Sequence, residues 1–474
     1  MRTVCLALLC ATAAAADVGA PSMAGRLAGR SNGNDDGSLN GTRLPKPSRD
    51  PWYAAPAGWN TTAPGTVLKV RPHAYNMSAA MFDHYVDVFQ VLFRSTDSHD
   101  QPLFGVATVF VPETQAACWN GTATRNHTRN TTTTTTTCAH ALLSYHPPYD
   151  TAYLDASPSY GLQFGEPYGE IAVALQRGWF VSVPDYEGPH ASYGANRLAG
   201  HVILDSVRAV VPTLQRYAGV RTNSSNSTTH KNSTTRVALW GYSSGATATN
   251  FALELAGTYA PDLRIDGAVV GGMTANMTRS SELLSGRDVA GLLPQTLLGM
   301  TTQYPAQRAV LNDALWPAGV YNKTEFESAR TMSGWDALVH FAYQDVFRYF
   351  RHGRADVYES APLMTMFARE GWAGQHGAAP PPSVPAFYYQ AVADEMCPSA
   401  AVDAAVAGFC RQGGRVLYQR NLVGQHNDEL VNGRQRALNF LGDVLDGTQT
   451  TAMPATGCRV DNVTISVDPK GPFY

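Results

Sequence analysis

The pentapeptide Gly241–Gly245, Gly-Tyr-Ser-Ser-Gly, constrains this chain more than any other stretch. An apolar, strand-like run precedes it, and residues 246–259 are small, helix-forming and free of proline. A serine at the apex of such a strand–turn–helix unit takes unfavourable backbone angles, and the glycines stand where side chains would collide with a neighbouring strand or helix. Its hydroxyl projects beside the first free N–H groups of the helix, which can stabilise an oxyanion. We predict that Ser243 is a nucleophile; the alternative is a Gly-Ser turn without chemistry.

The N-terminus predicts export. Residues 1–16 contain one basic side chain, an apolar stretch and a small-residue end, which is typical of a secretory signal peptide. No other run is long and apolar enough to cross a bilayer, so we expect a secreted, extracellular protein without a transmembrane segment. Many Asn-x-Ser/Thr sites suit a glycosylated chain. The twelve predicted glycosylation sites are Asn40, Asn60, Asn76, Asn120, Asn126, Asn130, Asn223, Asn226, Asn232, Asn276, Asn322 and Asn462.

Two of the seven cysteines would leave with the signal peptide, and an oxidising compartment then favours two bridges and one free thiol. The expected pairs are Cys118–Cys138 and Cys410–Cys458, which leaves Cys397. We expect Cys397 to be a small buried packing residue. A cysteine nucleophile is the poorer interpretation, because no Cys-His motif accompanies this residue. The histidines and cysteines show no spacing typical of a metal site, so we predict neither a metal nor a cofactor.

The net charge of −3 and the pI of about 6.5 provide no basic surface, which argues against nucleic acid as a partner. Residues 17–50 are rich in Gly, Ser, Asn and Arg with little apolar periodicity, and we interpret them as a disordered leader or propeptide. The stretch 115–138 is of low complexity and ends in a run of threonines, which indicates an exposed loop. The remaining chain is long and apolar enough to bury a large core.

Strand and helix patterns alternate along that remaining chain. The expected strands are 84–94, 103–112, 140–145, 179–184, 236–240, 267–272, 384–392 and 415–419, and the expected helices are 168–177, 199–217, 246–259, 399–411 and 434–445. The first two strands should pair in antiparallel. The repeating order of strand, helix and strand predicts an α/β fold with a mostly parallel central sheet and right-handed crossovers.

The alternation breaks over residues 278–383, which lack strand patterns and are helical and aromatic, most densely from Glu325 to Phe350. Aromatic residues at helical spacing are usually core. Because these lie between two sheet strands, we predict an inserted helical cap or lid over the place where substrate arrives. The core then consists of residues 51–277 and 384–474.

A nucleophilic serine needs a base within hydrogen-bond reach and a carboxylate that orients the base, and in this architecture their chain order is Ser, acid, His. Asp394 ends the first strand after the insertion, although it would also suit a turn cap. Glu395 is its neighbour and stays an alternative. His426 follows the last predicted strand and is our candidate base. Asp185 also ends a strand but precedes Ser243, so we assign it a structural role.

Several separate motifs resemble the fungal secretory lipases of the Candida antarctica lipase A type. They occur in the same order and are Gly178–Gly188, Gly241–Ala246, Tyr259–Leu263, Asp394–Pro398 and Arg436–Leu441. The resemblance extends from Asp50 to about Cys458. It implies an α/β-hydrolase with a helical cap and a triad of Ser243, Asp394 and His426.

The resemblance also implies an oxyanion hole at Asp155 and Ser244, and a bridge like Cys410–Cys458. Ser244 departs from this family, in which the residue after the nucleophile is glycine. The implied function is a serine ester hydrolase that works through an acyl-enzyme on lipid or triacylglycerol esters, as a monomer with transient contact to a lipid interface. The alternatives are a deacetylase of an acetylated fungal metabolite such as a trichothecene, and a non-catalytic binding protein.

Overall fold

A ten-stranded sheet organises the part of the chain that the computed structural model describes, residues 43–72, 85–113, 141–164, 169–221, 235–375, 379–449 and 451–467. Its strands are β1 (Val67–Pro72), β2 (Tyr85–Thr96), β3 (Pro102–Pro112), β4 (Ala141–His146), β5 (Phe180–Pro184), β6 (Arg236–Tyr242), β7 (Gly267–Gly271), β8 (Ala386–Ala391), β9 (Val416–Asn421) and β10 (Cys458–Val463). Their order across the sheet is β1-β2-β3-β5-β4-β6-β7-β8-β9-β10.

The sheet is antiparallel from β1 to β5 and parallel from β5 to β10. Strands β4, β5, β7 and β8 are buried along their whole length, because helices cover both faces. The predicted α/β fold with a mostly parallel sheet is confirmed.

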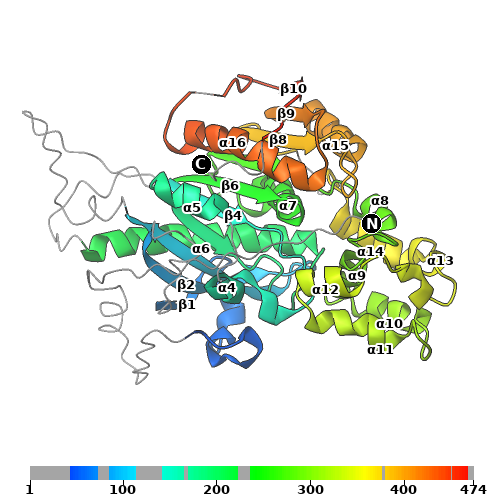
Figure 1. Cartoon of the computed structure of the whole chain (residues 1–474). Coiled ribbons are helices and arrows are strands. Elements are labelled where there is room, and N and C mark those ends of the chain that lie inside the picture. Colours follow the sequence, from blue (N-terminus) through cyan, green and yellow to red (C-terminus); the bar gives the residue numbers. More distant parts are fainter. Residues whose placement is uncertain are drawn as a thin grey trace, which may run out of the picture.

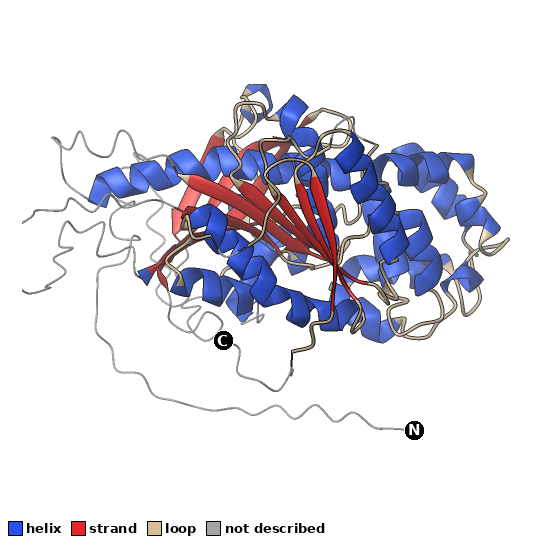
Figure 2. Ribbon diagram, turned by 90° about the horizontal axis from the view of Figure 1, so that it is seen from above, coloured by secondary structure: helices blue, strands red, loops and turns tan. Residues whose placement is uncertain are grey.

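Successive side chains of the strands point to opposite faces, and each face has its own core. Leu142 belongs to the core under α6, α7 and α15, whereas Leu143 belongs to the core under α5 and α16. Figure 2 shows helices on both sides of the twisted sheet. The helices outside the insertion are α4 (Pro158–Gly161), α5 (Gly169–Gln176), α6 (Asn196–Arg221), α7 (Ser244–Tyr259), α15 (Ser399–Arg411) and α16 (His426–Leu445).

Between β7 and β8 the chain is helical and gathers at one side of the sheet, on the right in Figure 1. These helices are α8 (Met277–Leu284), α9 (Leu292–Met300), α10 (Pro305–Ala314), α11 (Lys323–Glu327), α12 (Gly334–His340), α13 (Ala355–Tyr358) and α14 (Ala361–Gly371). They share a hydrophobic core that contains Phe326, Phe341 and Tyr349. Many of the aromatic residues of this segment are therefore core, but Trp335 is 74% exposed and Tyr343 is 73% exposed.

The structure differs from the sequence prediction at the edges of elements. Strands β1 and β10 were not predicted, because an edge strand that is half exposed shows no clear alternation. Helix α16 begins at His426, eight residues before the predicted start, with Gln425 and Asp428 forming a capping box.

Residues 43–50 were assigned to the disordered leader, and the structure shows them packed on the core. Leu44 is 3% exposed, and its N–H donates to Oε1 of Gln163 at 2.8 Å. Asp50 forms an ion pair of 2.6 Å with Arg71. The polar composition of this segment gave no sign that it is ordered, because the residues that hold it, Gln163 and Arg71, are distant in the sequence.

Several predictions lie outside the described residues. They are the signal peptide, leader residues 17–42, the Cys118–Cys138 pair, and the sites at Asn40, Asn76, Asn120, Asn126, Asn130, Asn223, Asn226 and Asn232. Within the described ranges, none of the helices has the length and hydropathy needed to traverse a lipid bilayer.

Candidate active site

The turn at Ser243 has the strained geometry that its sequence predicts. Ser243 has φ 56° and ψ −122°, and its N–H donates to the carbonyl of Gly271 at 2.9 Å. A Cβ on Gly241 would collide with the carbonyl of Gly245, and one on Gly245 would collide with the carbonyl of His146. Both glycines are required because backbone occupies the space of their missing side chains.

Three side chains from distant segments meet at this turn. Nε2 of His426 lies 2.9 Å from Oγ of Ser243, and Nδ1 lies 2.7 Å from Oδ2 of Asp394. His426 is 3% exposed and Asp394 is 7% exposed. Ser243 follows β6, Asp394 follows β8, and His426 begins α16 after β9. The carboxyl ends of parallel strands share one edge of the sheet, which brings these residues together.

Asp394 is held firmly in this position. Its Oδ1 accepts the N–H groups of Met396 at 3.0 Å and Cys397 at 2.7 Å, and its Oδ2 also accepts from Nε2 of Gln390 at 2.7 Å. The alternative acid, Glu395, accepts the backbone N–H of His426 at 3.0 Å. Asp394 therefore contacts the imidazole ring, whereas Glu395 supports the backbone that carries it.

The surroundings favour a charged imidazole. Burial lowers the pKa of His426, whereas the hydrogen bond to Asp394 and the charge of that carboxylate raise it. A ring that becomes positive during proton transfer is therefore stabilised where it stands.

The structure brings Asp150 to Ser244, where the resemblance predicted Asp155. The hydroxyl of Ser244 donates to the carboxylate of Asp150 and lies 3.1 Å from the hydroxyl of Tyr186. Asp155 instead accepts from the N–H and the hydroxyl of Ser48, both at 2.8 Å.

The reason for this difference is the position of the two acids along the loop. Asp150 lies four residues after the end of β4, at φ 45°, so it remains close to the carboxyl edge of the sheet. Asp155 lies in the short turn Leu154–Ala156, against the N-terminal segment. The position of Asp150 four residues after a buried strand was the signal that the sequence offered.

Asp185 has surroundings that suit the structural role assigned to it. Its carboxylate accepts the N–H of Ser159 at 2.8 Å and also the hydroxyl of that residue. Burial raises the pKa of Asp185 to about 7, against which the hydrogen bonds from Ser159 act.

The described cysteines divide as the sequence analysis expected. Cys410 and Cys458 form a disulfide that joins the end of α15 to the start of β10. Cys397 is free and buried, with its Sγ 3.0 Å from Oγ1 of Thr274. It also contributes to a group that sequence spacing missed, because the potential ligand atoms of Asp394, Cys397 and His426 all lie within 4.8 Å of one another.

Two of the predicted glycosylation sites have a structural function. Asn276 begins α8 and accepts the N–H of Arg279, and Asn322 begins α11 and accepts the N–H of Glu325. Glycosylation there remains a prediction, as it does at Asn60 and Asn462.

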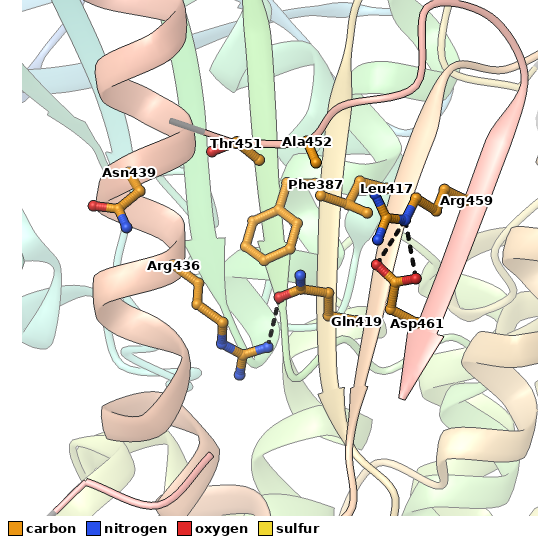
Figure 3. Close-up of a pocket in the computed structure, with 9 residues that line it drawn as sticks. All are labelled: Phe387, Leu417, Gln419, Arg436, Asn439, Thr451, Ala452, Arg459 and Asp461. Atoms are coloured by element: carbon orange, nitrogen blue, oxygen red, sulfur yellow. Dashed lines mark hydrogen bonds and ion pairs between the residues drawn. The ribbon is translucent and has the colours of Figure 1, made fainter. Parts of the chain in front are cut away.

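Two cavities lie apart from the contacts of Ser243. One, of about 170 Å³, lies beside α16, β8, β9 and β10 (Figure 3). It is lined by Phe387, Leu417, Gln419, Arg436, Asn439, Thr451, Ala452, Arg459 and Asp461. Arg436 donates to Gln419 and Arg459 pairs with Asp461, so its polar groups bind each other. The other, a cleft of about 640 Å³, lies between residues 152–155, Ser48 and the insertion, where Arg308 and Arg330 line it.

Comparisons with known proteins agree with this geometry. A model of the secretory lipase family matches residues 160–452. Trichothecene C-3 esterase of Fusarium sporotrichioides is 39% identical, over 88% of this chain and 88% of its own length. Lipase A of Arthroderma benhamiae is 30% identical, over 88% of this chain and 82% of its own length.

A solved structure shows that the fold is shared. The closed state of Candida antarctica lipase A superposes with a TM-score of 0.70 at 24% identity, over 86% of this chain and 89% of that one. The chain therefore belongs to the secretory lipase family of carboxylic-ester hydrolases, with the α/β-hydrolase fold.

Proposed function

We propose that the chain is a secreted serine esterase that cleaves carboxylic esters through an acyl-enzyme. The observation that carries this proposal is the position of His426, whose two ring nitrogens lie within hydrogen-bond distance of Ser243 and Asp394. A hydroxyl becomes a nucleophile when a base takes its proton and a carboxylate holds that base in one tautomer.

In the proposed mechanism, Oγ of Ser243 attacks the ester carbonyl carbon and passes its proton to Nε2 of His426. The bond from the carbonyl carbon to the alcohol oxygen then breaks, and His426 returns the proton to the leaving alcohol. Water repeats these steps on the acyl-enzyme and releases the acid. Asp394 holds Nδ1 of His426 protonated throughout.

The oxyanion needs donors, and two segments are placed to supply them. Ser244 is the first residue of α7, so its N–H belongs to the amides that have no carbonyl partner within the helix. We assign the second donor to the Asp150 turn in place of Asp155, because Asp150 contacts Ser244. Each oxyanion donor typically stabilises the transition state by about 3 to 4 kcal/mol.

As substrate we propose a short acyl ester, such as an acetate, of a bulky alcohol of the trichothecene type. The relative with 39% identity is a trichothecene C-3 esterase, whereas the lipase is 30% identical. The resemblance implies glycine after the nucleophile in the lipases. The side chain of Ser244, which is bonded to Asp150, would then leave less room beside the carbonyl for a long acyl chain.

Hydrolysis of lipid esters is the second candidate, and the outer surface of α12 favours it. Gly334 begins α12 close to the carbonyl oxygens of Tyr149 and Asp150, so we infer that this helix is part of a cap at the active site. Trp335 and Val339 on its outer side are 74% and 67% exposed. Such an apolar surface suits contact with a lipid interface.

Labelling with a fluorophosphonate tests the enzyme proposal. We expect the reagent to label the wild-type protein. It should not label the Ser243→Ala variant, and an unchanged melting temperature would show that this variant is folded. Absence of labelling in folded wild-type protein would favour a non-catalytic binding protein instead.

A series of p-nitrophenyl esters from acetate to palmitate then separates the two substrate classes. Activity confined to the shortest esters supports the proposed short-acyl esterase. A maximum at long chains would overturn it in favour of the lipase.

A further inference from the structure

We propose that Asp394, Cys397 and His426 form a binding site for a thiolate-preferring divalent cation, represented by Zn²⁺, and that occupation of this site stops ester hydrolysis. The potential ligand atoms of the three residues lie within 4.8 Å of one another, and all three residues are buried. The inhibition rests on the proposed role of His426, whereas cation binding does not depend on it.

Local structure holds the two ligands of the β8 loop together. Asp394 and Cys397 are three residues apart on one tight turn, in which Oδ1 of Asp394 accepts the N–H of Cys397 at 2.7 Å. Oγ1 of Thr274 lies 3.0 Å from Sγ of Cys397. The third ligand, His426, arrives from the start of α16 and contacts Asp394 at 2.7 Å.

Packing keeps this turn rigid. Cys397 shares a small hydrophobic cluster with Met396, Leu284 and Leu292, which joins the β8 loop to helices α8 and α9 of the insertion. Preorganised donors of this kind bind a cation with little further loss of conformational freedom.

The donor set selects the class of cation. One sulfur, one nitrogen and one oxygen suit a tetrahedral Zn²⁺ ion, with bonds of about 2.0 to 2.3 Å and a fourth position left for water. Small shifts of the three side chains from their present separations would close such a shell. Mg²⁺ and Ca²⁺ prefer shells made of oxygen and should bind poorly at a site with a thiolate. Binding releases the thiol proton of Cys397 to solvent.

Cation binding and catalysis exclude each other because both ring nitrogens of His426 are already in use. Nε2 contacts Ser243 at 2.9 Å and Nδ1 contacts Asp394 at 2.7 Å. A cation that takes either nitrogen removes one of these hydrogen bonds. The enzyme then loses either the base for Ser243 or the carboxylate that orients the base.

A spectroscopic experiment tests the binding site independently of activity. Co²⁺ serves as the probe, because a thiolate ligand produces a charge-transfer band in the near ultraviolet. We expect this band in the Ser243→Ala protein and its loss in Ser243→Ala/Cys397→Ala and Ser243→Ala/Cys397→Ser, with Zn²⁺ displacing Co²⁺ in the parent. Two cysteine variants are used so that a folding defect in one does not decide the result. A band of equal size with and without Cys397, or no band in the parent, would overturn the proposal.

A kinetic experiment tests the inhibition, with every rate divided by that of the same protein in EDTA. We expect Zn²⁺ to inhibit the wild type reversibly, Mg²⁺ and Ca²⁺ to leave it active, and Cys397→Ala to raise the half-inhibitory Zn²⁺ concentration roughly ten-fold or more. His340→Gln and His352→Gln are the matched controls, because both histidines pair with carboxylates at the surface. If the half-inhibitory Zn²⁺ concentration rises in these surface variants and stays unchanged in Cys397→Ala, the proposal is wrong. A wild type that hydrolyses no ester would refute the proposed function, and the Co²⁺ band would still decide the binding site.

Discussion

The hydroxyl of Ser244 donates a hydrogen bond to the carboxylate of Asp150 and so joins the first turn of α7 to the loop after β4. Burial raises the pKa of Asp150, while the bond from Ser244 and the charge of His426 partly oppose that shift. Ser244 also lies 3.1 Å from the hydroxyl of Tyr186. The contact therefore connects the two segments that we propose as oxyanion donors.

Replacing Ser244 tests this connection. We expect Ser244→Ala to lower kcat roughly 10- to 100-fold, because the Asp150 turn loses its anchor and the oxyanion donors lose alignment. KM should change little, since the lost interaction acts in the transition state. Ser244→Thr keeps a hydroxyl and should recover part of the activity. Steady-state kinetics on p-nitrophenyl acetate provide the measurement, and an unchanged kcat in Ser244→Ala would contradict the assignment.

The neighbouring acids Asp394 and Glu395 form a matched pair. Asp394→Asn should lower kcat by about 10⁴-fold, because the amide favours the wrong tautomer of His426. Glu395→Gln should have a far smaller effect, since the carboxylate of Glu395 accepts from the backbone N–H of His426 and not from its ring. Equal losses of kcat in the two variants would refute our choice of acid.

Gly334 tests whether α12 controls the site. A Cβ at this position would lie 2.8 Å from the carbonyl oxygen of Asp150 and 2.9 Å from that of Tyr149. We expect Gly334→Ala to displace the Asp150 turn and to lower kcat/KM roughly ten-fold. Gly408→Ala is the control, because the nearest atom to its Cβ is a flexible Arg411 nitrogen at 3.8 Å. If kcat/KM of Gly334→Ala equals that of Gly408→Ala, the position of α12 does not affect catalysis and the prediction is wrong.

The buried side chain of His146 should make the free energy of unfolding fall in acid. Burial lowers its pKa to about 3, and the neutral ring bonds Ser144 at 2.9 Å and Thr249 at 2.7 Å. Because the folded pKa lies below the unfolded value of 6.5, this contribution is complete above pH 6.5 and is lost as the pH falls towards 3. The free energy of unfolding should fall by about 1.4 kcal/mol per pH unit from this group.

Denaturant titrations between pH 7 and 4 measure that slope. His146→Gln should show a flatter dependence on pH than the wild type, whatever its stability at pH 7. His352→Gln, at the surface, should keep the wild-type slope. An unchanged slope in His146→Gln would contradict the prediction.

The Cys410–Cys458 disulfide should contribute to the free energy of unfolding and leave kcat unchanged. It closes a sequence separation of 48 residues at the start of β10, where β9 also begins, whereas the proposed triad lies beyond the opposite ends of the strands. The Cys410→Ser/Cys458→Ser protein should lose roughly 2 to 4 kcal/mol in free energy of unfolding. We compare kcat of both proteins at one temperature, 20 °C below the melting temperature of the variant. At that temperature the two kcat values should match. A large fall in kcat with unchanged stability would contradict this separation.

The sequence determined the features that depend on local sterics and chain order. The turn at Ser243 follows from Gly241 and Gly245, because their neighbours are backbone atoms of the same strand–turn–helix unit and of β4. The α/β pattern predicted most of the sheet, and the order Ser243, Asp394, His426 followed from the strands that precede them. Each of these predictions used short local motifs and their order along the chain.

Only the tertiary structure decided which neighbours in the chain become neighbours in space. Asp150 replaces Asp155 at Ser244, and Asp394 rather than Glu395 contacts the imidazole, because the path of each loop fixes the direction of its side chains. Cys397 joins Asp394 and His426 only when the loop after β8 meets the start of α16. Side-chain direction in loops depends on packing against distant segments, and a linear pattern of residue types does not contain that information.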